Sequence, residues 1–180
     1  MDSKEIQDDN KVLEGKSEDN ILGSSYSVRE PKYAASLAKL NDLKEKYPDA
    51  KEIVISRNIN LIKEVNDKAD AYWITSMPTG KYKTIDILSL TKMSGVVRDQ
   101  IERNPNDKYL ILFQGIDNLA ELNGFKSMYS LISSLTDVVA AKGNAVMLVQ
   151  YNANGLDSKE NGLLDSILKD ADDLSRELKN

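Results

Sequence analysis

The 180-residue sequence contains neither histidine nor cysteine. Without these side chains the protein cannot form a Ser-His-Asp or Cys-His nucleophile system, a histidine phosphorelay site, a zinc finger or the usual catalytic zinc site. The remaining possible chemistry uses carboxylate, lysine, tyrosine, serine or threonine side chains, or magnesium or calcium held by oxygen ligands. No group of such residues stands out in the sequence, so we predict no cofactor and assign no catalytic or metal-binding residue.

Long apolar runs and blocks of like charge are also missing. No run approaches the roughly 20 apolar residues that span a bilayer, and the start, MDSKEIQDDN, does not resemble a signal peptide. The 24 basic and 29 acidic residues are interspersed, with a formal net charge of -5. This disfavours nucleic-acid binding, which needs clustered Lys and Arg. We expect a soluble cytoplasmic protein that has no membrane span and binds a protein partner or itself.

The chain divides into a polar leader and a region in which apolar residues recur at the spacing of helices and strands. Residues 1–29 are rich in charged and small polar residues, which predicts a disordered acidic tail. A partner-docking peptide at 21–26 is the alternative interpretation of the end of this tail. Residues 30–180 have the size and apolar content of a single α/β domain, so no disulfide or metal is needed to stabilise it.

Helices and strands are predicted to alternate along residues 30–180. Helices are expected near residues 31–47, 61–65, 89–103, 125–142 and 157–178. Strands are expected at residues 53–55, 71–76, 109–114 and 145–151. These strands are apolar throughout rather than at every second residue. The pattern therefore predicts a three-layer α/β sandwich, with a mostly parallel central sheet of about four strands and helices on both faces.

Polar residues follow each of the four predicted strands. In parallel sheets, ligands bind beyond the carboxyl ends of the strands, and these ends share one edge of the sheet. This edge is therefore the candidate site for a ligand or partner. The candidate residues that this rule places at the edge are Ser56, Arg57, Thr75, Ser76, Gln114, Asp117, Asn152 and Asn154.

Motifs for nucleotide hydrolysis are absent from this framework. A phosphate-binding loop needs glycines followed by Lys and then Ser or Thr, but the nearest segment, TGKYKT, has Tyr82 after Lys81. Gln114 ends the third strand, where an aspartate would help to hold magnesium. Asp117 is expected to cap the short turn after it, and a metal-binding role is the alternative. A phosphoryl-receiver domain is excluded as well, because Arg57 and Gln114 stand at strand ends that would have to be acidic.

Three further features bear on binding and packing. Arg57 either binds an anion or partner carboxylate, or is an ordinary surface arginine. Trp73 is predicted to pack in the core. The final helix carries leucines at three- and four-residue spacing, so its apolar face either covers the sheet or forms a dimer.

The order of short motifs from Ile53 to Leu174 resembles the archaeal domain of unknown function 835 family. The motifs are IVISRN, AYWITS, TIDILSL, YLILFQGIDNLAELNGF and AVMLVQY. The matching positions are Ser56, Arg57, Trp73, Asp86, Gly115, Ile116, Asp117, Leu119, Asn123, Gly124 and Phe125. The chain departs from the family pattern at Gln114 and Asn118, where acidic residues are usual.

The resemblance implies a RecA-like fold without a phosphate loop, and no established activity. We therefore expect a non-catalytic interaction or regulatory domain in archaeal signal transduction or in an assembly scaffold. One alternative is a nucleotide- or anion-binding sensor that uses the strand ends. The other is a structural homodimer formed through the C-terminal helix.

Overall fold

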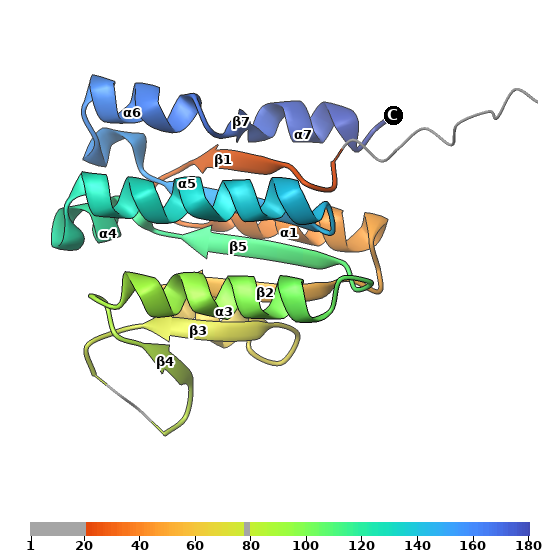
Figure 1. The fold of residues 1–180 in the computed structure, drawn as a ribbon, viewed down its shortest axis with the longest axis horizontal. Coiled ribbons are helices and arrows are strands. Elements are labelled where there is room, and N and C mark those ends of the chain that lie inside the picture. The colour runs from red at the N-terminus through yellow and green to blue at the C-terminus, as the bar shows by residue number, and fades with distance from the viewer. Residues whose placement is uncertain (1–20, 78–79) are drawn as a thin grey trace, which may run out of the picture.

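The computed structural model describes residues 21–77 and 80–180, which fold into a layered α/β structure (Figure 1). Its strands are β1 (Ser25–Arg29), β2 (Lys51–Ser56), β3 (Asp70–Ile74), β4 (Lys83–Ile85), β5 (Tyr109–Gln114), β6 (Ala145–Tyr151) and β7 (Lys169–Asp170). Its helices are α1 (Ala34–Lys46), α2 (Ile59–Val65), α3 (Leu90–Arg103), α4 (Ile116–Asn123), α5 (Phe125–Lys142), the 3-10 helix η1 (Ala153–Gly155), α6 (Ser158–Asp165) and α7 (Ala171–Glu177). None of the described helices is long and apolar enough to cross a membrane.

The strands form one sheet in the order β4-β3-β2-β5-β6-β1-β7, and every neighbouring pair is parallel. The predicted α/β fold with a parallel sheet is confirmed. The predicted number of about four strands is wrong, because the sheet has seven. The expected strands correspond to β2, β3, β5 and β6. The additional strands are β1, β4 and β7.

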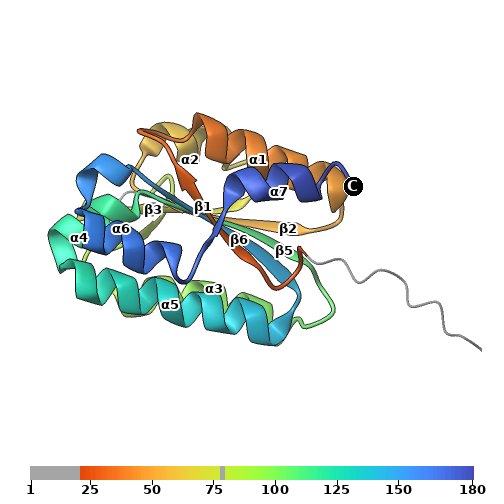
Figure 2. The same ribbon diagram turned by 90° about the horizontal axis from the view of Figure 1, so that it is seen from above.

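Helices cover both faces of the sheet (Figure 2). One face packs against α1, α2 and α7, and the other packs against α3, α4, α5 and α6. Every residue of β5 and β6 is buried. The two layers of helices explain why these two strands are apolar on both sides.

The end of the predicted tail is part of the sheet. Residues 25–29 form β1, which lies between β6 and β7. Tyr26 is fully buried and its hydroxyl donates to Glu177 Oε2 at 2.7 Å. Ile21 is also buried, so the segment considered as a partner-docking peptide contributes to the protein's own core. Residues 1–20 of the predicted tail lie outside the described part of the chain.

The predicted final helix is wrong as a single element. The capping box of Asp157 and Glu160 begins α6 as expected, but α6 ends at Asp165. The chain then extends into β7, where Lys169 pairs with Tyr26, before α7 begins. The first helix also differs from the prediction, since it covers Ala34–Lys46 rather than residues 31–47.

Candidate functional site

The candidate site lies at the carboxyl edge of the parallel sheet. β2 leads into α2 on one face of the sheet, whereas its neighbour β5 leads into α4 on the other. Adjacent strands whose connections leave toward opposite faces define a crevice where α/β proteins commonly bind ligands. In this protein the β1–α1 loop, residues 30–33, contacts the ends of β5 and β6 beside that crevice.

Gln114 ends β5 and lies almost completely buried, at 6 % exposure. Its Oε1 accepts a hydrogen bond from the Ser56 hydroxyl on β2. Its Nε2 donates to the Lys32 carbonyl in the β1–α1 loop at 3.4 Å. The Ser56 Oγ also accepts from the Asn58 amide at 2.8 Å. Gln114 therefore connects the neighbouring strand to the loop.

Gln150 occupies the matching position on β6, in register with Gln114. Its Oε1 accepts from the Gly115 amide at 2.9 Å, and its Nε2 donates to the Glu30 carbonyl at 2.6 Å. Both strand-end glutamines thus donate to carbonyls of the β1–α1 loop. Their amide groups hold that loop against the sheet edge.

Glu30 turns its carboxylate onto the amino end of α1. Oε1 accepts from the Ala35 amide at 2.8 Å, and Oε2 accepts from the amide and the hydroxyl of Ser36, both at 2.6 Å. The first amides of a helix lack partners within the helix and carry a partial positive charge, so they attract anions. Here the protein's own carboxylate satisfies two of them.

Asp117 contacts the β6 end of the edge and does not cap its own segment. That segment is the helix α4, which begins after Gly115 in the left-handed conformation and has no side-chain cap. Asp117 Oδ1 instead accepts from the Asn152 amide at 3.2 Å. The Asn152 side chain accepts from the Asn154 amide at 3.1 Å and caps η1. These three candidate residues therefore form a second group, which stabilises the loop after β6.

Apart from Ser56, the side chains of the candidates at the ends of β2 and β3 make only local contacts or none in the described structure. Thr75 Oγ1 accepts from the Met77 amide at 3.1 Å, and Ser76 is exposed. Arg57 is also exposed and pairs with no acidic residue in the described ranges. Its carbonyl accepts from Trp73 Nε1 at 3.1 Å. Trp73 is only partly buried, at the margin of the core where α2 packs.

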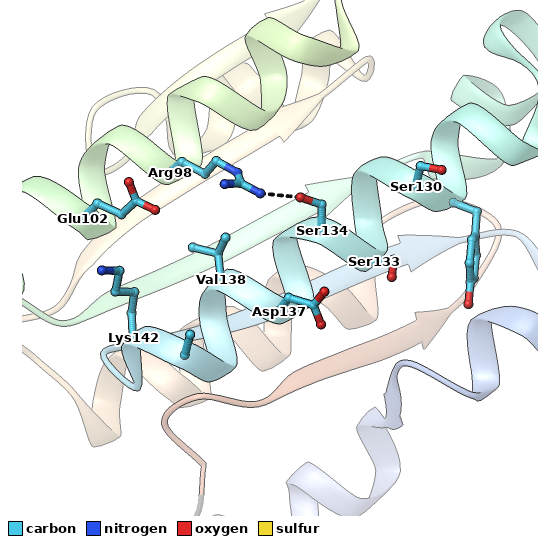
Figure 3. Close-up of a pocket in the computed structure, with 10 residues that line it drawn as sticks. Arg98, Glu102, Ser130, Ser133, Ser134, Asp137, Val138 and Lys142 are labelled. Atoms are coloured by element: carbon cyan, nitrogen blue, oxygen red, sulfur yellow. Dashed lines mark hydrogen bonds between the residues drawn. The ribbon is translucent and has the colours of Figure 1, made fainter.

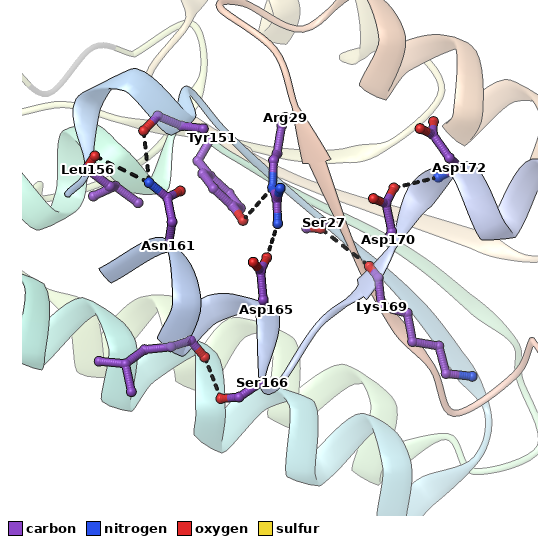
Figure 4. A network of polar contacts seen from close by, with 12 residues as sticks. Ser27, Arg29, Tyr151, Leu156, Asn161, Asp165, Ser166, Lys169, Asp170 and Asp172 are labelled. Atoms are coloured by element: carbon purple, nitrogen blue, oxygen red, sulfur yellow. Dashed lines mark hydrogen bonds and ion pairs between the residues drawn. The ribbon is translucent and has the colours of Figure 1, made fainter. Parts of the chain in front are cut away.

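A further polar network fixes α6 beside the same edge (Figure 4). Arg29, at the end of β1, donates from Nε to the Tyr151 hydroxyl at 3.2 Å and forms an ion pair with Asp165 of α6. Asn161 Nδ2 donates to the carbonyl oxygens of Ala153 and Leu156, at 3.0 and 3.2 Å. The network holds the start of the C-terminal region against β1 and β6.

Sequence reasoning missed four residues of this edge: Arg29, Glu30, Lys32 and Gln150. Arg29 is the last residue of β1, and Glu30 and Lys32 follow this strand, which the sequence pattern assigns to the disordered tail. Gln150 carried a usable signal, because it is a polar residue near the end of a recognised apolar strand, as Gln114 is. Within the described residues, no group of three or more acidic side chains could hold a metal ion.

Comparisons with known proteins agree with this fold. A search of curated proteins finds no match. Among solved structures, the chain is similar to a protein of Pyrococcus horikoshii OT3 described as "Structural study of Project ID PH0250", with a TM-score of 0.50 and 10 % identity. The match covers 82 % of this chain and 79 % of that chain. The model of the family "Protein of unknown function (DUF835)" matches residues 34–168, so the chain belongs to that family.

Proposed function

We propose that this protein is a non-catalytic RecA-like domain that acts through a protein partner, in signal transduction or as a scaffold in an assembly. In nucleotide-binding α/β proteins, the phosphates lie at the amino end of a helix that directly follows a strand. The corresponding place after β1 is the start of α1. The observation that carries the proposal is that the Glu30 carboxylate already occupies the amides there.

Gln114, at the end of β5, supports the same proposal. An aspartate at a strand end would supply negative charge for magnesium, whereas a neutral amide does not. Both polar ends of Gln114 are engaged, by Ser56 and by the Lys32 carbonyl. The edge is thus closed by contacts within the chain, which leaves the outer surface of the domain as the part available to partners.

Calorimetric titration with ATP and magnesium tests the absence of nucleotide chemistry. We expect no stoichiometric binding by the native protein, and no rise in its melting temperature with excess ATP. The variant Glu30→Gln, which removes the negative charge from the α1 amino end, provides the internal comparison. Stoichiometric, magnesium-dependent binding of ATP in the micromolar range by the native protein would overturn the proposal.

An anion sensor is the second candidate function, and one observation favours it. Arg57 is exposed at the end of β2 without an acidic partner in the described structure. Nearby, a groove of about 600 Å³ lies between α1 and α2 and is lined by Lys32, Asn58 and Asn60. The sensor would show nucleotide-dependent thermal stabilisation that disappears in Arg57→Ala. If no nucleotide stabilises the native protein, this candidate is removed.

The homodimer proposed for the C-terminal helix loses the observation that supported it. The apolar stripe of that helix consists of Leu164, Ile167, Leu168, Ala171, Leu174 and Leu178. Ile167 and Leu178 are partly buried against the protein's own core, and the other four are buried in it. The stripe is therefore explained by packing within one molecule.

A further inference from the structure

Arg98 is held by hydroxyl groups rather than by an acidic partner (Figure 3). It lies partly buried on α3, where Nε donates to Ser94 Oγ at 3.2 Å and a terminal nitrogen donates to Ser134 Oγ on α5. A guanidinium has five N–H donors and keeps its charge at all ordinary pH values. No carboxylate in the described ranges forms an ion pair with Arg98. The arginine is thus oriented while its charge and part of its donor capacity remain unused.

The arginine lines a groove of about 520 Å³ between α3 and α5. Ser130, Ser133 and Ser134 of α5 contribute hydroxyl groups, and Val138 contributes apolar surface. Figure 3 shows Arg98 and Ser134 meeting across the space between the two helices. The groove therefore combines one fixed positive charge, several hydroxyl donors and an apolar wall.

We propose that the α3–α5 groove binds a glutamate or aspartate side chain presented by a segment of a protein partner in which one acidic residue stands beside apolar ones. This inference rests on the proposed interaction function and specifies the chemistry of the partner. Arginine pairs with a carboxylate through two parallel N–H···O bonds, and hydroxyl groups provide further donors. Lys142, at one end of the groove, adds a second positive charge.

Two acidic residues on the same groove favour a carboxylate over a phosphate. Glu102 and Asp137 are exposed and also line the groove. Their charges repel a bound phosphate, which carries up to two negative charges, more than a carboxylate, which carries one. The same residues select against strongly acidic polymers such as nucleic acids. The balance of charge therefore fits a segment with an isolated acidic residue beside apolar ones.

Nuclear magnetic resonance titration of the full chain tests this assignment. The probes are a capped pentapeptide with one glutamate between apolar residues, its counterpart with glutamine, and inorganic phosphate. We expect the glutamate peptide to shift the Arg98 Nε–H resonance saturably, in the millimolar range. The glutamine peptide and phosphate should bind at least about tenfold more weakly, a difference of about 1.4 kcal/mol.

Three variants separate a bound carboxylate from a general charge effect. Arg98→Gln should abolish saturable binding, measured by the shifts of neighbouring backbone amides. Ser130→Glu should weaken it about tenfold or more by placing a competing carboxylate in the groove, without removing either serine that holds Arg98. The control Arg103→Gln changes an exposed arginine of the same helix, which pairs with Asp99, and should leave binding unchanged.

The inference is overturned if the native protein shows no saturable shift with the glutamate peptide, or if phosphate binds more tightly. Equal loss of binding in Arg98→Gln and Arg103→Gln would overturn it too. The side-chain amide resonances of Gln114 and Gln150 should not move with the peptide. A shift of those resonances with ATP and magnesium would refute the non-catalytic proposal, whatever the result at Arg98.

Discussion

The side-chain amides of Gln114 and Gln150 join the sheet edge to the β1–α1 loop, and the Glu30 carboxylate joins that loop to the start of α1. Each glutamine uses its oxygen on a donor of the scaffold and its nitrogen on a carbonyl of the loop. Buried polar groups are stable when they are paired in this way. Gln114, which stands where an aspartate would help to hold magnesium, is therefore better described as one of two matched supports for a loop.

Removal of the Glu30 carboxylate should weaken the fold. We expect Glu30→Ala to lower the free energy of unfolding by about 1–2 kcal/mol, because two amides at the start of α1 lose their acceptors. Glu45→Ala, an exposed position on the same helix, should change it by less than about 0.5 kcal/mol. Urea denaturation followed by circular dichroism measures both. Equal effects of the two substitutions would argue against the capping role.

Two glycines near the C-terminal region should respond oppositely to alanine. A Cβ at Gly155 would lie 3.3 Å from Asp117 Oδ2 and disturb its bond to the Asn152 amide, whereas a Cβ at Gly162 meets nothing within 4 Å. We expect Gly155→Ala to lower the free energy of unfolding by about 0.5–1 kcal/mol. Gly162→Ala, inside α6, should raise it by about 0.4–1 kcal/mol. Thermal denaturation of the two variants should shift in opposite directions.

At the scale of elements, Asp70 fastens the outer strands to α3. Its carboxylate accepts from Lys83 of β4, from Gln100 of α3 and from the Tyr72 hydroxyl, the last at 2.8 Å. Burial alone raises the pKa of Asp70, but the hydrogen bonds from Lys83, Tyr72 and Gln100 outweigh it and lower the pKa below its ordinary value. Burial and the neighbouring Asp70 raise the pKa of Tyr72 to about 12.

This lowered pKa predicts a pH-dependent contribution to stability. Since the carboxylate is favoured in the folded state, its contribution is present above the unfolded pKa of about 3.9 and is lost as the pH falls through the lower folded value. Asp70→Asn should therefore be less stable than the native protein at pH 7, and the difference should shrink below about pH 4. Asp67→Asn, at an exposed position, is the control. A difference that is constant from pH 7 to pH 2 would contradict the prediction.

The burial and length of each strand explain whether it could be predicted from the sequence. β2, β3, β5 and β6 were predictable because helices cover both of their faces and their residues are mainly apolar. β1 was missed because its five residues, SYSVR, alternate small polar residues with Tyr26 and Val28 and read as part of a polar leader. β4 and β7 have three and two residues, too few to form a pattern.

The candidate site was predictable only where a recognised strand led into it. Ser56 and Gln114 were placed correctly on one edge and do touch. The position of the β1–α1 loop on this edge was not predictable, because Glu30 and Lys32 reach the edge only through the long-range pairing of β1 with β6. A single sequence carries no local signal for a pairing between residues more than a hundred positions apart.

For the whole molecule, stability should decrease from the centre of the sheet to its margins. β5 and β6 are completely buried, whereas β4 and β7 are the outermost strands. In hydrogen exchange, we expect the amides of β5 and β6 to exchange only through global unfolding and those of β4 and β7 through local opening. If β4 amides were protected as long as those of β5, the sheet would instead open as one unit.

The position of β1 between β6 and β7 also bears on how the protein is made. Tyr26 pairs with Leu148 and Lys169, so this segment completes its pairing only after residues more than a hundred positions later have left the ribosome. At about 5–20 residues per second, the wait between the synthesis of Tyr26 and that of Lys169 is roughly 7–29 s. Until β6 has been synthesised, Tyr26 and Val28 have no neighbouring strand to pair with. Translation speed and chaperone binding should therefore influence the yield of folded protein through this one strand.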